Sequence, residues 1–191
     1  MPRYAPRPCA VDVLIREGVY EIAGLPIRAI PLPGHTDGHT GYWVQDVLFC
    51  GDILAGEQEL ASAKIIYAYS ITQRLESLRK LQSLSCAWYV LAHDAPRQDI
   101  SELVTRNLAQ MEETMSYVLR HVADRPGEAA DILDALCQHY GIHLRQVRDH
   151  SLLSLTLFAY LSHLHNSGQL AFVLERNRLL WRSVAAGFTP A

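Results

Sequence analysis

The chain has 191 residues, of which 49% are hydrophobic and 19% charged, and its formal net charge at pH 7 is −3. A chain of this length and composition can bury a core and form one or two globular domains. The small negative charge gives no overall case for binding nucleic acid or an acidic membrane. The N-terminus lacks the apolar core of a signal peptide, and no apolar run is long enough to cross a membrane.

The cysteines Cys9, Cys50, Cys86 and Cys137 are scattered and form no C-x-x-C pair. This pattern predicts isolated thiols in a reducing compartment. We therefore expect a cytoplasmic protein.

Three strands are predicted in the first part of the chain. Residues 25–32 form an apolar run that ends in a Pro-Gly turn, so His35 lies just beyond the end of this strand. Residues 42–45 and 47–50 are typical of a hairpin. If the first two runs pair antiparallel, the third runs in the same direction as the first, and Asp52 reaches the same sheet edge as His35.

A helix and a fourth strand follow. Residues 72–84 have apolar residues at helical spacing, and Ser70 with Gln73 three residues later is typical of a helix start. Such a crossover returns the chain to a parallel strand, here residues 87–92, which brings His93 to the same edge. The topology alone therefore predicts that three ligand-type side chains converge.

Imidazole and carboxylate groups bind zinc, iron and manganese alike, so the shared edge predicts a metal site formed by His35, Asp52 and His93. Each residue has a simpler reading by itself. A histidine in a Gly-Pro turn is usually solvated, and an Asp that follows Gly at a strand end is usually a helix cap or turn residue.

The motifs around these residues resemble the second half of the metallo-β-lactamase superfamily. They are Pro33-Gly34-His35-Thr36-Asp37-Gly38-His39, then Gly51-Asp52, then a strand that ends in His93. The third motif is looser, because Ala-His-Asp stands where the family usually has Gly-His-Gly. The resemblance implies two divalent metals, zinc or else iron or manganese, with Asp52 as the bridging, catalytic ligand and His35 and His93 on one ion each. It also implies that His39 is an orienting or packing residue and not a metal ligand.

The other half of the family's site, a His-x-His-x-Asp-His run, is absent from the sequence. The chain thus supplies part of each ion's ligands and all of neither, which puts its activity alone in doubt. The fold class that we expect is α/β (α+β). Residues 1–124 would be the C-terminal half of the αββα sandwich, a truncated domain that begins with a loop over residues 1–9.

A second module is expected over residues 125–191, after a long amphipathic helix at 100–122 that Asp99 is placed to cap. The predicted elements are helices at 128–140 and 152–165, a helical turn at 144–147, and a hairpin of residues 170–174 and 179–184. This order resembles the winged-helix tail of some superfamily members. We do not expect nucleic-acid binding, because five Arg balance five acidic residues from residue 126 onward and the helix at 152–165 has no Lys or Arg. A packing or dimerising accessory domain fits better.

The resemblance predicts a metal-dependent hydrolase of a small-molecule ester, thioester, lactone or related substrate. The loop at 55–69 would lie near the substrate and contribute Lys64, Tyr67 and Tyr69, although both tyrosines also suit packing of the loop on the core. The alternative is a non-catalytic half-domain that dimerises or binds a partner.

A half-sandwich would expose the apolar sheet face that contains Ile27, Val47 and Val90. The expected partner for this face is therefore a second copy of the chain or the missing N-terminal half.

Overall fold

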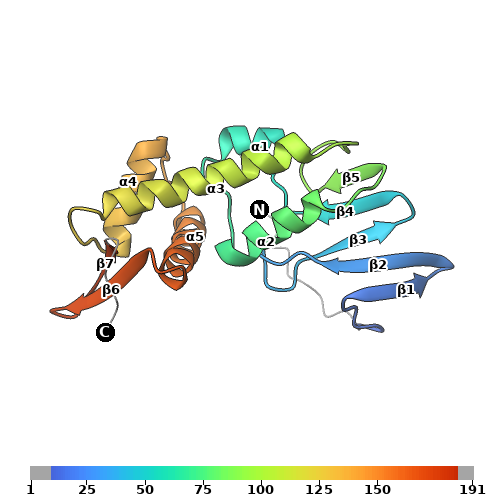
Figure 1. Cartoon of the computed structure of the whole chain (residues 1–191), viewed down its shortest axis with the longest axis horizontal. Helices are drawn as coiled ribbons and strands as arrows, with labels where there is room; N and C mark the ends of the chain where they lie inside the picture. Colours follow the sequence, from blue (N-terminus) through green and yellow to red (C-terminus); the bar gives the residue numbers. More distant parts are fainter. Residues whose placement is uncertain (1–9, 185–191) are drawn as a thin grey trace.

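The computed structural model describes residues 10–184, so the loop expected at residues 1–9 lies outside the described residues. Figure 1 shows a sheet at one end of the molecule and a helical module with a hairpin at the other, linked by the long helix α3. Within residues 10–184 no helix is both long and apolar enough to cross a bilayer. The sheet region contains β1 (Gly18–Ile22), β2 (Leu25–Pro31), β3 (Thr40–Val44), β4 (Val47–Gly51), α1 (Glu57–Ser62), α2 (Ile71–Gln82), β5 (Trp88–Leu91) and α3 (Ser101–His121).

The five-stranded sheet has the order β1-β2-β3-β4-β5. Neighbours pair antiparallel except β4 and β5, which are parallel because α2 crosses between them. These directions confirm the strands expected from the sequence. Strand β1 was not expected; it forms a hairpin with β2 through Ala23 and Gly24, both of which have positive φ angles.

The main core lies between one face of this sheet and the helices α2 and α3. Ser70 caps α2 as predicted, since its side chain accepts a hydrogen bond from the backbone N–H of Gln73 (3.4 Å). The expected cap of α3 is wrong by one residue. Ile100 occupies the cap position, and the Asp99 carboxylate accepts from the N–H of Ser101 instead (2.8 Å). The sheet residues of this core include Ile30, Leu48, Cys50, Tyr89 and Leu91.

The opposite face of the sheet is apolar and exposed. Strand pairing places Tyr42 opposite Phe49, and these side chains are 37% and 44% exposed, while Trp88 on β5 is 42% exposed. The register also puts Ile27, Val47 and Val90 on this face. Val47 pairs with Trp88 and Val90 pairs with Phe49, while Ile27 and Val47 both pair with Val44 on β3.

The C-terminal module contains α4 (Ala129–Tyr140), α5 (Val147–Asn166) and a hairpin of β6 (Leu170–Glu175) and β7 (Arg178–Ser183). The expected helix at 152–165 is confirmed but begins five residues earlier, and the separate helical turn expected at 144–147 is wrong. A single helix, α5, begins at Val147 after an extended Gln146, and Ser151 and Ser154 donate hydrogen bonds back to carbonyls one turn earlier. The module therefore has two helices and a hairpin after the Pro126 break, not three helices.

Helix α3 belongs to two cores. Its first half packs under the sheet through Leu103 and Val104, whereas Val118 and Val122 at its end pack with α4, α5 and the hairpin. Because one continuous helix contributes to both cores, it ties the module to the sheet region.

We predict that the exposed sheet face mediates association of the chain, since burial of apolar surface contributes about 25 cal/mol per Å². Light scattering of the 191-residue chain should show a dimer or larger oligomer. Phe49→Glu should weaken this association by about tenfold or more, because it would bury an unpaired charge.

The matched control is Leu155→Glu, which changes an exposed leucine on α5 (57% exposed) away from the sheet. A monomer at high concentration for the unmodified chain, or equal effects of the two substitutions, would contradict association through this face.

Candidate functional site

Three strand ends meet at one edge of the sheet. His35 follows β2, Asp52 follows β4 and His93 follows β5. Because β4 and β5 are parallel neighbours, the Asp52 Oδ1 and His93 Nε2 atoms lie 3.1 Å apart. The His93 side chain is 69% exposed and that of Asp52 37%, so their direct attraction contributes little to stability. The pair is accessible to a ligand from solvent.

His39 orients Asp52 through the backbone. The Asp52 N–H donates a hydrogen bond to His39 Nε2 (3.1 Å), so this nitrogen accepts and the ring is neutral. Burial lowers the pKa of His39, which favours the same neutral form. Gly51 makes room for the ring: its φ is +62°, and a Cβ there would lie 2.7 Å from His39 Nε2.

His35 lies half-buried beside this group. Its ring meets the Tyr67 ring edge-on with centroids 5.2 Å apart, and the His39 ring lies at 6.1 Å. Burial lowers the pKa of His35, and the opposing attraction of Asp52 only partly offsets it. A neutral imidazole is the form that binds metal, so the surroundings of His35 favour ligation.

The turn before His35 is clamped onto the start of α2. Gly34 has a φ of +129°, and a Cβ there would lie 2.4 Å from the backbone N and Cα of Arg74. Its carbonyl accepts hydrogen bonds from the N–H groups of Tyr69 (2.9 Å) and Ser70 (3.1 Å). Ser77 on the next turn of α2 donates to the Pro33 carbonyl (2.7 Å). The glycine in the sequence motif therefore allows a close backbone contact that fixes His35.

Sequence reasoning missed Arg74, which lies behind the site. The side chain is 1% exposed, and its Nη1 donates to the Tyr67 carbonyl (2.9 Å). Its Nη2 is buried and has no hydrogen bond within the part of the chain that the structure describes. Arg74 thus anchors the loop that carries the Tyr67 ring against His35. No local signal distinguishes it from a solvated arginine on α2.

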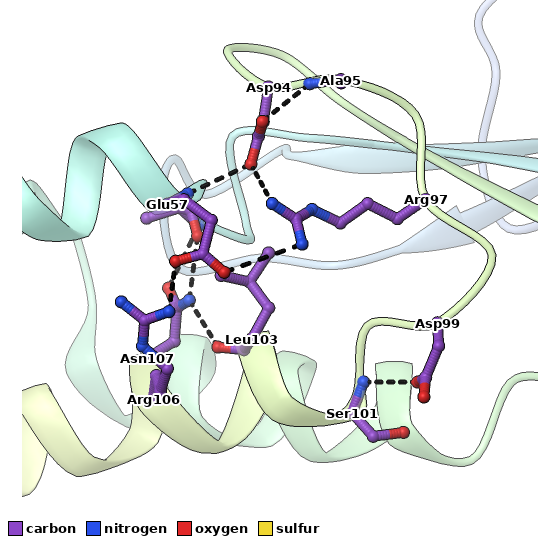
Figure 2. Close-up of polar contacts among 10 residues, drawn as sticks. Glu57, Asp94, Ala95, Arg97, Asp99, Ser101, Leu103, Arg106 and Asn107 are labelled. Carbon is purple, nitrogen blue, oxygen red and sulfur yellow. Dashed lines mark hydrogen bonds and ion pairs between the residues drawn. The ribbon is translucent and has the colours of Figure 1, made fainter.

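Asp94 accounts for the departure from the family's third motif. Figure 2 shows its carboxylate between the start of α1 and Arg97. The Oδ2 atom accepts from the Glu57 N–H (3.1 Å) and from Arg97 Nη2 (2.8 Å), and Oδ1 accepts from the Ala95 N–H (2.8 Å). The hydrogen bond from Arg97 is the main cause that lowers the pKa of Asp94. An acid next to His93 therefore has a structural role.

The same network joins the end of β5 to α3 (Figure 2). Glu57 pairs with Arg97 (3.7 Å) and with Arg106 on α3. Asn107, 2% exposed, binds both backbone groups of Ala55, accepting from its N–H (3.1 Å) and donating to its carbonyl (3.0 Å). The segment that follows Asp52 is therefore held in place by α3.

The three predicted substrate residues have different positions. Tyr67 is half-buried against His35, and Lys64 is exposed at the rim of a cavity that Tyr67 also lines. The Tyr69 side chain is 60% exposed and does not line that cavity. Tyr67 thus joins the site, Lys64 lies near it, and Tyr69 contributes its backbone N–H to the Gly34 turn.

The imidazole and carboxylate groups of this site are of types that bind divalent metals, but too few of them lie close together. Two atoms 3.1 Å apart, as in Asp52 and His93, can both lie about 2 Å from one ion. Within residues 10–184, however, no group of three or more His, Cys, Asp or Glu side chains lies close enough to hold a metal ion. Zinc sites generally use three or four protein ligands, so the described residues alone would leave the coordination shell of a zinc ion incomplete.

Gly34→Ala should destabilise the chain by about 2 kcal/mol or more, because it adds both a strained φ and a clash with the Arg74 backbone. The control is Gly38→Ala in the same loop, where a Cβ meets nothing within 4 Å. Chemical denaturation measures both variants. Equal stability of the two would contradict the clamp.

Acid should destabilise the chain through His35 and His39. Burial lowers both pKa values from 6.5 in the folded state, so the unfolded chain binds more protons as the pH falls. The stability contributed by these rings is complete above pH 6.5 and is lost as the pH falls through the lowered folded values. Thermal melts with a chelator present, from about pH 8 to about pH 5, measure this loss.

The His39→Gln variant isolates one of the two rings. A glutamine can still accept the Asp52 N–H but cannot take up a proton, so this variant should lose less stability in acid than the unmodified chain. His39→Ala leaves that N–H without its acceptor and should cost about 1–3 kcal/mol at neutral pH. An unchanged acid profile in His39→Gln would show that His39 does not contribute.

Parts of the chain are similar to known proteins. Residues 8–93 match the family model of the metallo-beta-lactamase superfamily. A hydroxyacylglutathione hydrolase from Shewanella denitrificans is 36% identical over 102 residues, which cover 51% of this chain and 38% of the relative. An atrochrysone carboxyl ACP thioesterase from Aspergillus fumigatus is 24% identical over 148 residues, which cover 70% of this chain and 45% of the relative.

A solved structure shows the same fold. The crystal structure of a beta-lactamase domain protein from Burkholderia ambifaria superposes with a TM-score of 0.77 at 16% identity, covering 93% of this chain and 53% of the other. The chain thus spans about half or less of the length of these proteins. The mixed α/β fold is confirmed, and residues 8–93 are similar to the metallo-beta-lactamase superfamily.

Proposed function

We propose that this chain contributes part of a two-metal centre to a hydrolase that acts on a thioester or related small-molecule substrate. The observation that carries the proposal is the 3.1 Å approach of Asp52 and His93 at adjacent strand ends, with half-buried His35 at the same sheet edge. The similarity to a hydroxyacylglutathione hydrolase and to an ACP thioesterase favours a thioester over the other carbonyl substrates.

In this proposal Asp52 would serve both ions, His93 would hold one and His35 the other. His39 fixes the Asp52 backbone, and Tyr67 keeps the His35 ring in place from its edge. Zinc is the proposed metal, with iron or manganese as alternatives of the same ligand chemistry. When bound, such ions supply a water of lowered pKa and polarise the substrate carbonyl.

The ligand count limits what these residues do alone. We propose that the remaining ligands come from a further polypeptide segment or another chain. The free thiols of Cys50, Cys86 and Cys137 fit a reducing, cytoplasmic setting for this assembly. The C-terminal module is proposed as a packing domain with no nucleic-acid role, since α5 has no Lys or Arg after Arg148.

Zinc titration of the purified 191-residue chain tests the centre. We expect weak binding of less than two ions per chain and little hydrolysis of generic thioesters, because each ion has only two of its ligands. Asp52→Asn should abolish the remaining binding, since Asp52 serves both ions, and His35→Ala or His93→Ala should weaken it by about tenfold or more.

The matched control is His143→Ala, an exposed histidine between α4 and α5. Zinc binding that falls equally in His143→Ala would contradict the proposed centre. Two tightly held ions per chain would show that further ligands lie within the chain itself.

A second candidate function is a non-catalytic partner-binding unit, which the exposed face of Tyr42, Phe49 and Trp88 favours. The two candidates differ in their dependence on Asp52. If Asp52→Asn leaves every measured property unchanged while Phe49→Glu disrupts assembly, partner binding is the better account.

A further inference from the structure

A cavity of about 370 Å³ lies beside the candidate centre, between the segment that follows α1 and the C-terminal module. Ile65, Ile66 and Tyr67 line one side of it, and Leu152, Leu153 and Thr156 on α5 line the other. Its volume falls in the range of about 300–1,000 Å³ that is typical of small-molecule sites. The cavity exists only because the module packs against the sheet region.

Tyr67 connects this cavity to the centre. Tyr67, which lines the cavity, packs its ring edge-on against His35 with centroids 5.2 Å apart. A substrate whose carbonyl lies at Asp52 and His93 would therefore reach the cavity past a single side chain. The wall is well fixed, because Arg74 binds the Tyr67 carbonyl (2.9 Å) and the Ala68 N–H donates to Thr156 Oγ1 (3.4 Å).

The lining determines the ligand class. Most of it is apolar, which favours an alkyl or aryl group over a polar one. The charged residues at its edge are Glu59, Lys64 and Asp149. Two acids against one lysine disfavour a ligand with an anionic end inside the cavity. An uncharged apolar chain is the best match.

We infer that this cavity binds the apolar acyl chain of the substrate and that α5 thereby sets the chain-length preference. The inference rests on the proposed function for the identity of the ligand as an acyl thioester, whereas binding of an apolar chain in the cavity does not depend on catalysis. It gives the C-terminal module a direct role in substrate selection.

Displacement of the neutral dye Nile red from the 191-residue chain tests the inference with a chelator present throughout. The competitors are N-acetylcysteamine thioesters of butanoic, octanoic and dodecanoic acid. Affinity should rise from butanoyl to octanoyl as more of the chain enters the cavity. Leu152→Trp, which fills the cavity, should weaken octanoyl binding by about tenfold or more.

The matched control is Leu155→Trp, the same substitution three residues along α5 at a leucine that does not line the cavity. It should leave the affinities within about twofold of the unmodified chain. Circular dichroism of both variants establishes that each is folded.

Equal octanoyl affinity in Leu152→Trp and the unmodified chain would overturn the inference, as would affinity that does not depend on chain length. Because no metal is present, either result leaves the proposed hydrolytic function standing. Conversely, a failure to detect zinc binding would contradict the proposed metal centre but would not change the thioester affinities, which are measured without metal. The two failures are therefore distinguishable.

Discussion

The contact between Gly34 and the backbone of Arg74 is the constraint on which the site depends. A side chain at residue 34 would need to pass within 2.4 Å of the Arg74 backbone, so only glycine lets the turn approach α2 this closely. The approach places His35 at the sheet edge and brings Arg74 under the loop that carries Tyr67. One backbone contact thus fixes both a candidate ligand and the ring that borders it.

The second requirement is the parallel pairing of β4 and β5. Parallel neighbours end at the same edge, which brings Asp52 and His93 together although they are far apart in the sequence. The polar network of Asp94, Glu57 and Arg97 then ties that edge to α1. The charged groups of this network pair with one another, whereas the side chains of Asp52 and His93 stay accessible to solvent.

The two faces of the sheet have different physical roles. One is covered by α2 and α3 and forms the main core, and the other presents Tyr42, Phe49 and Trp88 to solvent. The module at the far end of α3 has its own core, and its helix α5 returns to touch the segment after α1. The candidate centre is therefore linked through Tyr67 to a largely apolar cavity, and the same sheet carries an exposed apolar face.

The sequence by itself determined the strands β2 to β5 and their directions, the capped start of α2 and the positions of His35, Asp52 and His93 just beyond strand ends. These features follow from local periodicity, turn residues and the rules of strand connection, all of which act over short stretches of chain. The family resemblance rested on the same motifs. The joined helix α5 was missed because its first turn is rich in polar residues and resembles a loop.

Only the tertiary structure decided the roles of Arg74, Asp94 and Tyr67. Each role depends on a partner that sequence pattern does not specify: Arg74 holds a loop carbonyl, Asp94 meets the start of α1, and Tyr67 meets His35. Tyr67 and Tyr69 looked equivalent in sequence, yet Tyr67 packs against His35 and Tyr69 is 60% exposed. Side-chain partners across long separations are set by packing, and so they became visible only once the elements were placed in space.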